Sequence, residues 1–293
     1  MKSSEPTLFI VATPIGTLSD LSPRAREVLS SAGFIACEDT RHTKELFMAL
    51  GLSHGPLVSL HEHNERHKSA ELAERLRSSP EQTAALVSDA GTPAISDPGA
   101  IFVEECHNAG IRIESIPGPS SLVAAAAASG FLRPRLVFSG FLSRSENDHK
   151  AEFKVWTYSA PCVAVCFESP HRVMQTLKHA QQFFTTDVRV CVSREISKKF
   201  EEHIRGTLAE AIGKLSEKDT LRGEYVLCFD LPESIKMTPA SLNLSLDEVT
   251  NIALDSLKQD PSAKVRDVTK SLAELHGISA KELYNAVIGL RNK

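Results

Sequence analysis

The chain has 293 residues, of which 42% are hydrophobic and 24% charged, and its formal net charge is −4 at pH 7. This composition is that of an ordinary soluble globular protein, and it excludes collagen-like, disordered and disulfide-scaffold classes. The length predicts about two domains. The longest apolar run, Leu122 to Ala128, is too short to cross a membrane. Considered alone, the negative charge argues mildly against a nucleic-acid partner.

The six cysteines are scattered along the chain and form no CxxC pair. Four of them lie in apolar, strand-like runs, so we expect buried free thiols in a reducing environment and no cysteine-bound zinc. The first seven residues contain one lysine and no apolar stretch, and therefore do not resemble a signal peptide. We expect a cytoplasmic protein.

In the first part of the chain, short apolar runs alternate with helical patterns. Strands are predicted at 8–12, 34–37, 57–60, 84–87 and 111–116. Helices are predicted at 23–31, 42–50, 65–77 and 99–109. Ser22 is the expected N-cap of the first helix, and Gly51 is expected to end the second. This order predicts an α/β domain at 7–118 with a mostly parallel sheet covered on both faces.

A second α/β domain is predicted at 119–231, after a break near 117–134 that is rich in Pro, Gly, Ser and Ala. Its strands are expected at 136–139, 162–168, 188–193, 199–205 and 224–229. Only two clear helical patterns interrupt them, at 172–184 and 207–215. Because several connections are short, we expect a mixed sheet with some antiparallel pairs.

A Pro-, Ser- and Asn-rich segment at 232–244 predicts a linker to a small all-helical domain at 245–293. Helices are expected there at 246–257, 264–276 and 280–290. Gly277 lies between the last two helices and Ser279 is a plausible N-cap, which is the outline of a helix-turn-helix.

Glycine and proline gather in three loops, each directly after a predicted strand: Thr13–Leu18, Ser88–Gly99 and Pro117–Ser121. In an open α/β sheet such loops converge at the carboxyl ends of the strands, where ligands bind. Glycine lets the backbone approach a ligand closely, and proline stiffens the loop. The chain contains neither GxGxxG nor GxxxxGK[ST]. The loops therefore predict a small-molecule pocket built mainly from backbone groups, for a ligand that is not strongly anionic.

Polar side chains follow three other strand ends, at Glu38–Thr43, Glu168–Arg172 and Arg194–Lys198. Carboxylates beside Arg, His or Lys suit proton transfer and anion contact, and the alternative is helix capping with surface ion pairs. His63 and His67 have the spacing of zinc-binding helical histidines, but the intervening Glu65 falls about 200° from His63 around a helix. His61 precedes them, yet no further ligand is placed, so we expect no metal site.

Together these motifs resemble the ribosomal RNA small subunit methyltransferase I family, of the tetrapyrrole-methylase (class III methyltransferase) superfamily. The resemblance rests on TPIGTLSDLSPRA, CEDTRHT, LHEHNE, LVSDAGTPAISDPG, PGPSS, FESPHR, SREISK and RGEYVL. It covers residues 7–230, and the C-terminal helices resemble the family's helical domain. It implies S-adenosylmethionine bound in a cleft between two α/β domains, 2′-O-methylation of the cytidine at position 1402 of 16S rRNA in the small ribosomal subunit, and a homodimer. Two positions depart from the family: Thr17 stands where Asn is common, and Ser120 where related chains vary.

Carried over residue by residue, the resemblance assigns cofactor contacts in the first domain to Pro14, Ile15, Gly16, Asp89, Gly91, Thr92, Ile95, Ser120 and Ser121. It assigns those in the second domain to Phe167, Gly206, Thr207, Gly223 and Glu224. Methyl transfer to a ribose also requires that the 2′-hydroxyl lose its proton to a nearby base. Our hypothesis for the ribose side is a set in which no single base is chosen: Glu38, Asp39, Arg41, His42, Glu168 and Arg194.

Two other functions stay open at this point. A tetrapyrrole methylase would share the fold and cofactor, but the first loop reads TPIG instead of the GxG typical of those enzymes, and the C-terminal helices would be unexplained. A non-catalytic ribosome-binding factor would not need intact loops. The charge is also uneven, with six basic against three acidic residues at 261–293 and five against three at 189–205. We therefore predict RNA contact at these two segments and at the Arg-bearing clusters described above.

Overall fold

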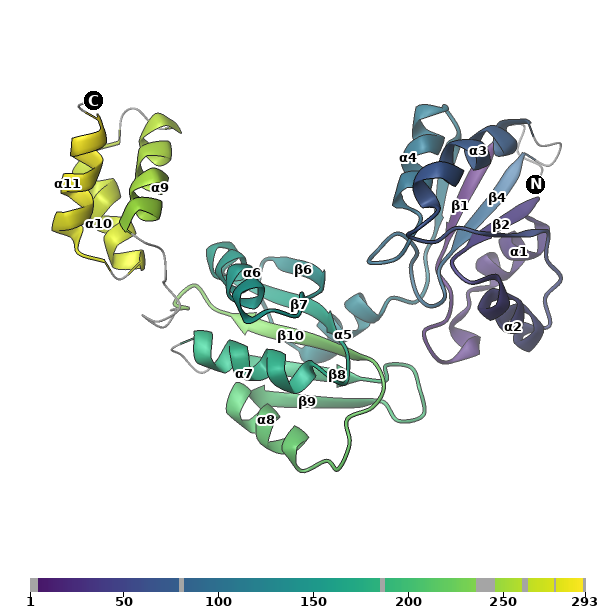
Figure 1. Cartoon of the computed structure of the whole chain (residues 1–293). Helices are drawn as coiled ribbons and strands as arrows, with labels where there is room; N and C mark the ends of the chain where they lie inside the picture. Colours follow the sequence, from purple (N-terminus) through teal and green to yellow (C-terminus); the bar gives the residue numbers. More distant parts are fainter. Residues whose placement is uncertain are drawn as a thin grey trace.

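The computed structural model describes residues 5–78, 82–184, 188–235, 246–259, 263–276 and 278–291. Figure 1 shows two sheets with their helices, followed by three C-terminal helices drawn in yellow and yellow-green. Within the described residues, none of the helices combines the length and the apolar character that a membrane crossing needs.

The N-terminal sheet is parallel throughout, as predicted. Its order is β3-β2-β4-β1-β5, made of β1 (Thr7–Val11), β2 (Phe34–Cys37), β3 (Leu57–Ser59), β4 (Thr83–Val87) and β5 (Arg112–Ile116). Helices α1 (Pro23–Ser31) and α2 (Thr40–Leu50) bury apolar side chains such as Leu29 and Phe47 against one face. Helices α3 (Glu65–Ser78) and α4 (Ala100–Asn108) cover the other. Both faces of the sheet are therefore covered, which is why the inner strands β2 and β4 are mostly apolar and buried without alternation, whereas the edge strand β5 carries exposed Arg112 and Ser115.

Local caps explain where the helices of this half begin and end. The Ser22 hydroxyl accepts a hydrogen bond from the N–H of Ala25, and Gly51 ends α2 in the left-handed conformation. Helix α2 starts two residues before the predicted position because the side chain of Asp39 accepts from the N–H of Arg41. A short 3-10 helix, η1 (Leu18–Asp20), follows the first loop.

The second sheet is mixed, as predicted. Its order is β6-β7-β10-β8-β9, made of β6 (Leu136–Phe141), β7 (Cys162–Glu168), β8 (Arg189–Arg194), β9 (Glu202–Thr207) and β10 (Tyr225–Leu231). Only β6 and β7 pair in parallel. Strand β9 starts three residues later than predicted, because residues 195–201 form a loop with Glu195 and Ser197 in the left-handed conformation.

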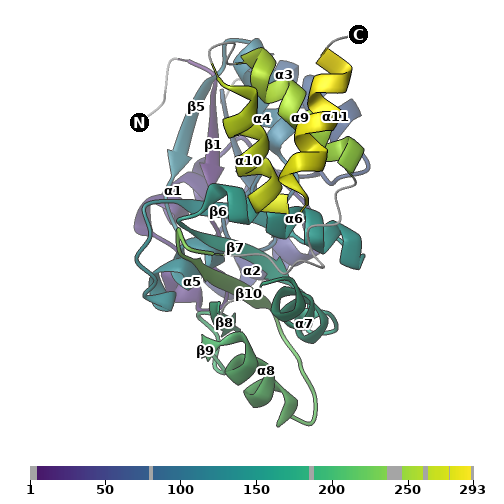
Figure 2. The same ribbon diagram turned by 90° about the vertical axis from the view of Figure 1, so that its left-hand side faces the viewer.

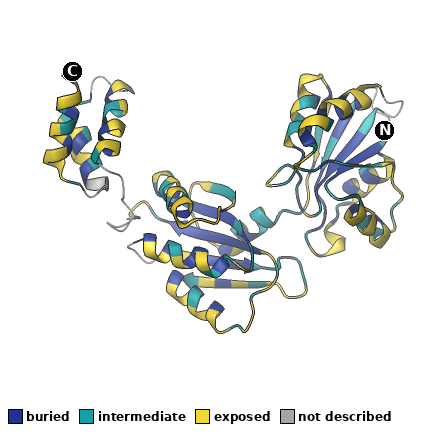
Figure 3. Ribbon diagram, in the orientation of Figure 1, coloured by how far each residue is buried: buried dark blue, intermediate teal, exposed yellow. Residues whose placement is uncertain are grey.

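Four helices cover this sheet, two of which the sequence analysis did not predict. The expected α7 (Val173–Phe183) and α8 (Leu208–Ser216) lie on one face together with α6 (Glu146–Ser159), which contributes Phe153 and Trp156. Helix α5 (Ser121–Ser129) packs on the other face through Ala125. Figure 3 shows the central strands β7, β8 and β10 mostly buried between these layers. All six cysteines are free and buried, as predicted.

The C-terminal part forms three helices, as predicted: α9 (Leu246–Gln259), α10 (Val265–His276) and α11 (Ala280–Arg291). They enclose a small apolar core of their own that includes Val249, Ala273 and Leu283. Figure 2 shows the three helices packed side by side. Most of the predicted linker and the Gly277 turn lie outside the described residues.

Candidate functional site

The three Gly/Pro loops meet at the carboxyl edge of the N-terminal sheet and are joined by hydrogen bonds. Thr13 and Gly91 exchange backbone hydrogen bonds, with N–O distances of 2.8 and 3.1 Å. The hydroxyl of Thr92 donates to the carbonyl oxygen of Pro119 at 3.2 Å. Gly91 has a φ of +84°, which a side chain would strain, so glycine is needed at this junction. The loops therefore form one surface.

That surface forms one side of a cavity of about 390 Å³, and the ends of β7 and β10 form the other. This volume is within the range of small-molecule sites. Ten residues predicted to contact the cofactor line it: Ile15, Asp89, Gly91, Thr92, Ile95, Ser120, Ser121, Phe167, Gly223 and Glu224. The lining also includes residues to which the sequence alone assigned no role, among them Asp97, Phe141, Ile196 and Tyr225. Asp97 lies in the loop Ser88–Gly99, which was predicted from its glycines and prolines, but its position in the cavity lining was not predicted.

Four of the predicted cofactor residues do not line the cavity: Pro14, Gly16, Gly206 and Thr207. Thr207 pairs with Arg189, at the opposite end of β8 from Arg194. Its hydroxyl caps α8 by accepting from the N–H of Glu210. The antiparallel β8–β9 pair therefore carries Gly206 and Thr207 away from the cavity, and we leave both out of the proposed site.

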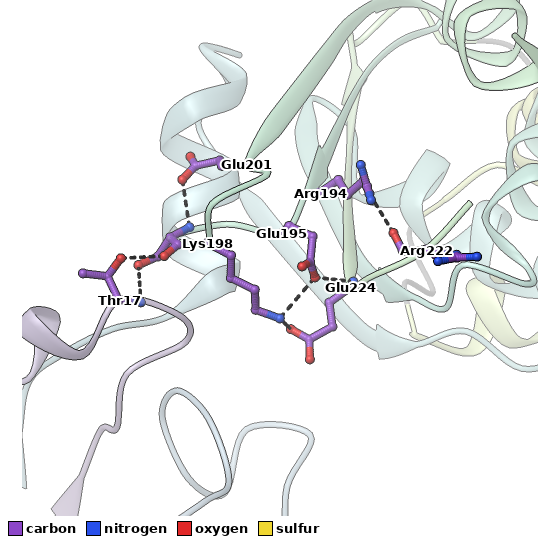
Figure 4. Close-up of polar contacts among 8 residues, drawn as sticks. Thr17, Arg194, Glu195, Lys198, Glu201, Arg222 and Glu224 are labelled. Carbon is purple, nitrogen blue, oxygen red and sulfur yellow. Dashed lines mark hydrogen bonds and ion pairs between the residues drawn. The ribbon is translucent and has the colours of Figure 1, made fainter. Parts of the chain in front are cut away.

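Gly16 instead lies against Ser197, in the loop that follows β8. Figure 4 shows the neighbouring Thr17 hydrogen-bonded to the same loop. A Cβ on Gly16 would lie 2.5 Å from the Ser197 carbonyl oxygen. The Thr17 N–H donates to Ser197 Oγ at 3.1 Å, and the Thr17 hydroxyl donates to the Ser197 carbonyl at 2.7 Å. The Ser197 hydroxyl donates to the Asp20 carboxylate. We call these contacts the interdomain latch.

Beside the latch, Lys198 links two carboxylates at the edge of the cavity (Figure 4). Its Nζ lies 3.1 Å from Glu195 Oε1 and 2.9 Å from Glu224 Oε2. Glu195 Oε1 also accepts from the N–H of Glu224 at 3.0 Å. A Cβ on Gly223 would lie 2.6 Å from the Glu195 carboxyl carbon, so the Gly223–Glu224 turn depends on glycine. Glu224 is thus positioned through both its backbone and its side chain.

Two of the six residues proposed for the ribose side have structural partners instead. Glu168 lines the cavity, but its carboxylate is fully buried and accepts from Thr176 Oγ1 at 2.6 Å, Ser169 N at 2.8 Å and Arg172 Nη2 at 2.8 Å. Arg194 Nε donates to the carbonyl oxygen of Arg222 at 2.6 Å. The Glu168 carboxylate fixes the loop that follows β7, which leaves it poorly placed to take a proton from a substrate.

The other four lie around the start of α2. Arg41 and His42 are exposed, and Arg41 forms an ion pair with Asp39 at 2.7 Å. The hydrogen bonds from Arg41 hold the pKa of Asp39 well below its usual range. Burial, followed by the negative charges of Asp89, Asp97 and Asp39, raises the pKa of Glu38. Glu38 is therefore the stronger base of the two carboxylates.

Glu38, Asp39, Asp89 and Asp97 form an acidic cluster beside the cavity. The N–H of Asp39 donates to Asp89 Oδ1 at 3.3 Å, which ties the end of β2 to the second loop. Burial and the charge of Asp89 raise the pKa of Asp97. The cavity lining includes Asp89, Asp97 and Glu224, whereas no Lys, Arg or His of the described chain lines it. The site therefore favours a ligand that carries positive charge.

Metal ligands were not expected, and the histidines singled out above have other neighbours. His61 Nε2 lies 3.1 Å from Asn64 Nδ2, and the backbone N–H of His61 donates to Asn64 Oδ1 at 2.9 Å. Across the described residues, no three His, Cys, Asp or Glu side chains lie close enough together to hold a metal ion.

Comparison with known proteins matches residues 7–212 to the family model of tetrapyrrole (corrin/porphyrin) methylases. The chain is 41% identical over 220 residues to ribosomal RNA small subunit methyltransferase I of Synechocystis, covering 75% of this chain and 77% of the relative. It is 33% identical over 288 residues to the protein of the same name from Mesorhizobium japonicum, covering 98% and 93%. Uroporphyrin-III C-methyltransferase from Thermus thermophilus, complexed with S-adenosyl homocysteine, shares the fold with a TM-score of 0.50 at 16% identity, over 76% of this chain and 96% of that one. The chain therefore belongs to the ribosomal RNA small subunit methyltransferase I family within the tetrapyrrole methylases.

Proposed function

We propose that this protein transfers a methyl group from S-adenosylmethionine to the 2′-hydroxyl of the cytidine at position 1402 of 16S rRNA. The observation that carries the proposal is the cavity, in which backbone-rich loops of one sheet face the ends of β7 and β10 and, among the described residues, no cation lines the wall. Relatives that span nearly the whole chain are named as small-subunit rRNA methyltransferases. These names favour an rRNA substrate over the tetrapyrrole alternative.

The residues of the cavity fit S-adenosylmethionine. The ligand carries a sulfonium and an ammonium group, which the carboxylates of Asp89 and Asp97 attract, whereas the Glu224 carboxylate is paired with Lys198. Phe141 and Phe167, with ring centroids 5.5 Å apart, supply aromatic surface for a planar base. A fold neighbour at 16% identity was crystallised with S-adenosyl homocysteine, which supports the same ligand class. We retain as cofactor contacts the ten predicted residues that line the cavity.

When bound, S-adenosylmethionine supplies an electrophilic methyl group on a positively charged sulfur. The loops of this chain hold the ligand through groups that are already hydrogen-bonded in place, so little reorganisation is needed for in-line attack. A base must accept the hydroxyl proton, and the acidic cluster offers candidates with raised pKa values. We propose Asp97, which lines the cavity, as the first candidate and Glu38 as the second.

Single-turnover methyl transfer to small ribosomal subunits tests this assignment. We expect Asp97→Asn to lower the rate constant by at least about a hundredfold, the range of general-base catalysis, while the dissociation constant for S-adenosylmethionine is measured in parallel. Asp255→Asn is the matched control, because Asp255 is exposed on α9 and does not line the cavity. Wild-type rates in both Asp97→Asn and Glu38→Gln would contradict the assignment. Mapping 2′-O-methyl groups on rRNA tests the reaction itself.

We further infer a homodimer that works in the cytoplasm on the small ribosomal subunit. Support for self-association comes from the edge strand β6 and the segment before it, where Leu132, Leu136 and Phe141 are more than half exposed. Sedimentation equilibrium tests it: a monomer at micromolar concentration would contradict the inference. We also propose the domain division at 7–118, 119–231 and 245–293 with a linker at 232–244.

A further inference from the structure

A second cavity, separate from the methyl-transfer site, lies between α10 and α11. It is a groove of about 610 Å³, and its lining includes Arg266 and Lys270 on α10 and Lys281 and Tyr284 on α11. The remaining lining residues are small or apolar apart from Thr269. The Thr269 hydroxyl donates to the Val265 carbonyl oxygen at 2.8 Å, so it is already satisfied within the helix. The polar character of the groove therefore comes from its three cations and one phenol.

Helix geometry places these four side chains along the same groove. Arg266 and Lys270 are four residues apart on α10, and Lys281 and Tyr284 are three apart on α11, so each pair shares one helix face. The acidic Asp267 and Glu282 each follow a groove cation directly and project about 100° away around the helix. Neither acidic residue lines the groove. The helix pair therefore separates positive from negative charge.

The three cations have no ion-pair partner among the residues that the structure describes. On α9, by contrast, Lys258 pairs with Asp255 at 2.9 Å. Tyr284 is 40% exposed, whereas its neighbour Leu283 on α11 belongs to the helical core. Unpaired cations around an accessible aromatic ring are the combination that binds a nucleic-acid strand, since the cations contact phosphates and the ring stacks on a base.

We propose that the α10–α11 groove binds the RNA substrate through its sugar-phosphate backbone, with Tyr284 stacking on an unpaired base. This inference rests on the proposed function, because it assigns the gripping surface for the same rRNA. It also divides the work between two oppositely charged sites: the acidic cavity holds the methyl donor, and the basic groove holds the anionic substrate. The groove then contributes to substrate binding and not to the chemical step.

The test neutralises the groove in the full-length protein with Arg266→Gln, Lys270→Gln and Lys281→Gln combined. The matched control combines Lys178→Gln, Lys214→Gln and Lys258→Gln, which removes the same charge at exposed lysines elsewhere. The probes are protein-free small-subunit rRNA and assembled small subunits, each titrated over a range of monovalent salt. Far-UV circular dichroism melting and S-adenosylmethionine binding show whether each variant is folded.

We expect the groove variant to bind protein-free rRNA at least tenfold more weakly at about 0.15 M salt. The slope of log affinity against log salt should be smaller by about 2 to 3, since each phosphate contact contributes about 0.7 to 0.9. Tyr284→Ala should weaken binding by about fivefold or more, whereas Tyr284→Phe should not. In methyl transfer, KM for subunits should rise while kcat stays within about twofold.

Wild-type affinity and salt slope in the groove variant would overturn the proposal, as would an equal loss in the lysine control. A groove variant that loses affinity for assembled subunits but not for protein-free rRNA would also overturn it, by showing that the groove contacts a ribosomal protein. Failure of the proposed function would give a different result. The wild-type protein would then bind rRNA through the groove but transfer no methyl group to it.

Discussion

Replacing Gly16 by alanine tests whether the interdomain latch shapes the methyl-donor site. The new Cβ would lie 2.5 Å from the carbonyl oxygen and 2.7 Å from the carbonyl carbon of Ser197. Both are backbone atoms, which a rotamer change does not remove. The first loop must therefore move away from Ser197, and the hydrogen bonds among Thr17, Ser197 and Asp20 are lost.

The size of the effect follows from those three hydrogen bonds. All are solvent-exposed, so each is worth at most the usual net 0.5 to 1.5 kcal/mol, and the latch as a whole about 1 to 3 kcal/mol. Ile15, next to Gly16, and Ile196, next to Ser197, both line the cavity. If the ligand requires the closed arrangement, Gly16→Ala should weaken S-adenosylmethionine binding by about fivefold to a hundredfold.

Isothermal titration calorimetry with S-adenosylmethionine measures this loss. Gly213→Ala is the matched control, because Gly213 lies in α8 and a Cβ there meets nothing within 4 Å. Thr17→Ala separates two explanations: it removes a latch hydrogen bond, and Thr17 does not line the cavity. If Gly16→Ala weakened S-adenosylmethionine binding and Thr17→Ala left it unchanged, Gly16 would contact the ligand directly. Wild-type S-adenosylmethionine affinity in Gly16→Ala would refute the inference that the latch shapes the methyl-donor site.

Three further predictions concern single side chains. Glu65→Ala should lower the free energy of unfolding in urea by about 2 to 3 kcal/mol, because the buried Glu65 carboxylate accepts from two N–H groups at the start of α4, while Glu65→Gln should cost less. S-adenosylmethionine affinity should fall as the pH is lowered, and the fall should begin at a higher pH than the ordinary Asp and Glu pKa values of about 4 would give. Burial raises the pKa of Glu38 and of Asp97, and protonation removes the charge that attracts the ligand, so binding should release protons in calorimetry. Thr207→Ala should lower stability by about 1 kcal/mol through loss of the α8 cap, with ligand affinity unchanged; weaker binding would restore Thr207 to the site.

The parts of the fold that could be predicted from sequence are those with a local cause. Ser22 and Gly51 mark helix ends through hydrogen bonds and backbone angles that involve only neighbouring residues. Helix α5 was missed because its run of alanines lacks the helical periodicity of apolar and polar residues on which the prediction relied. It is helical because alanine has the highest helix propensity, because Ser120 caps it, and because its small side chains pack closely on the second sheet.

The candidate site divides in the same way. Its loops were predicted because glycine and proline have backbone preferences that are legible in the sequence, and ten of the fourteen residues assigned to the cofactor line the cavity. The roles of the polar residues were harder to predict. A glutamate such as Glu168 looks the same in the sequence whether its carboxylate takes a proton from a substrate or anchors a loop. Only the three hydrogen bonds to that carboxylate in the structure distinguish the two roles. The latch joins residues 180 positions apart, so no local pattern predicts it.

The charges of the cavity constrain how RNA reaches it. Asp89 and Asp97 stand in a lining to which the described residues contribute no cation, so they repel phosphates at close range, although they suit a cationic methyl donor. At physiological salt this repulsion is screened beyond about 8 Å, so a phosphate held on a remote cation does not experience it. Affinity for rRNA must therefore come mainly from cations away from the cavity. The negative net charge of the chain is thus compatible with an RNA substrate, because the position of each charge matters more than the sum.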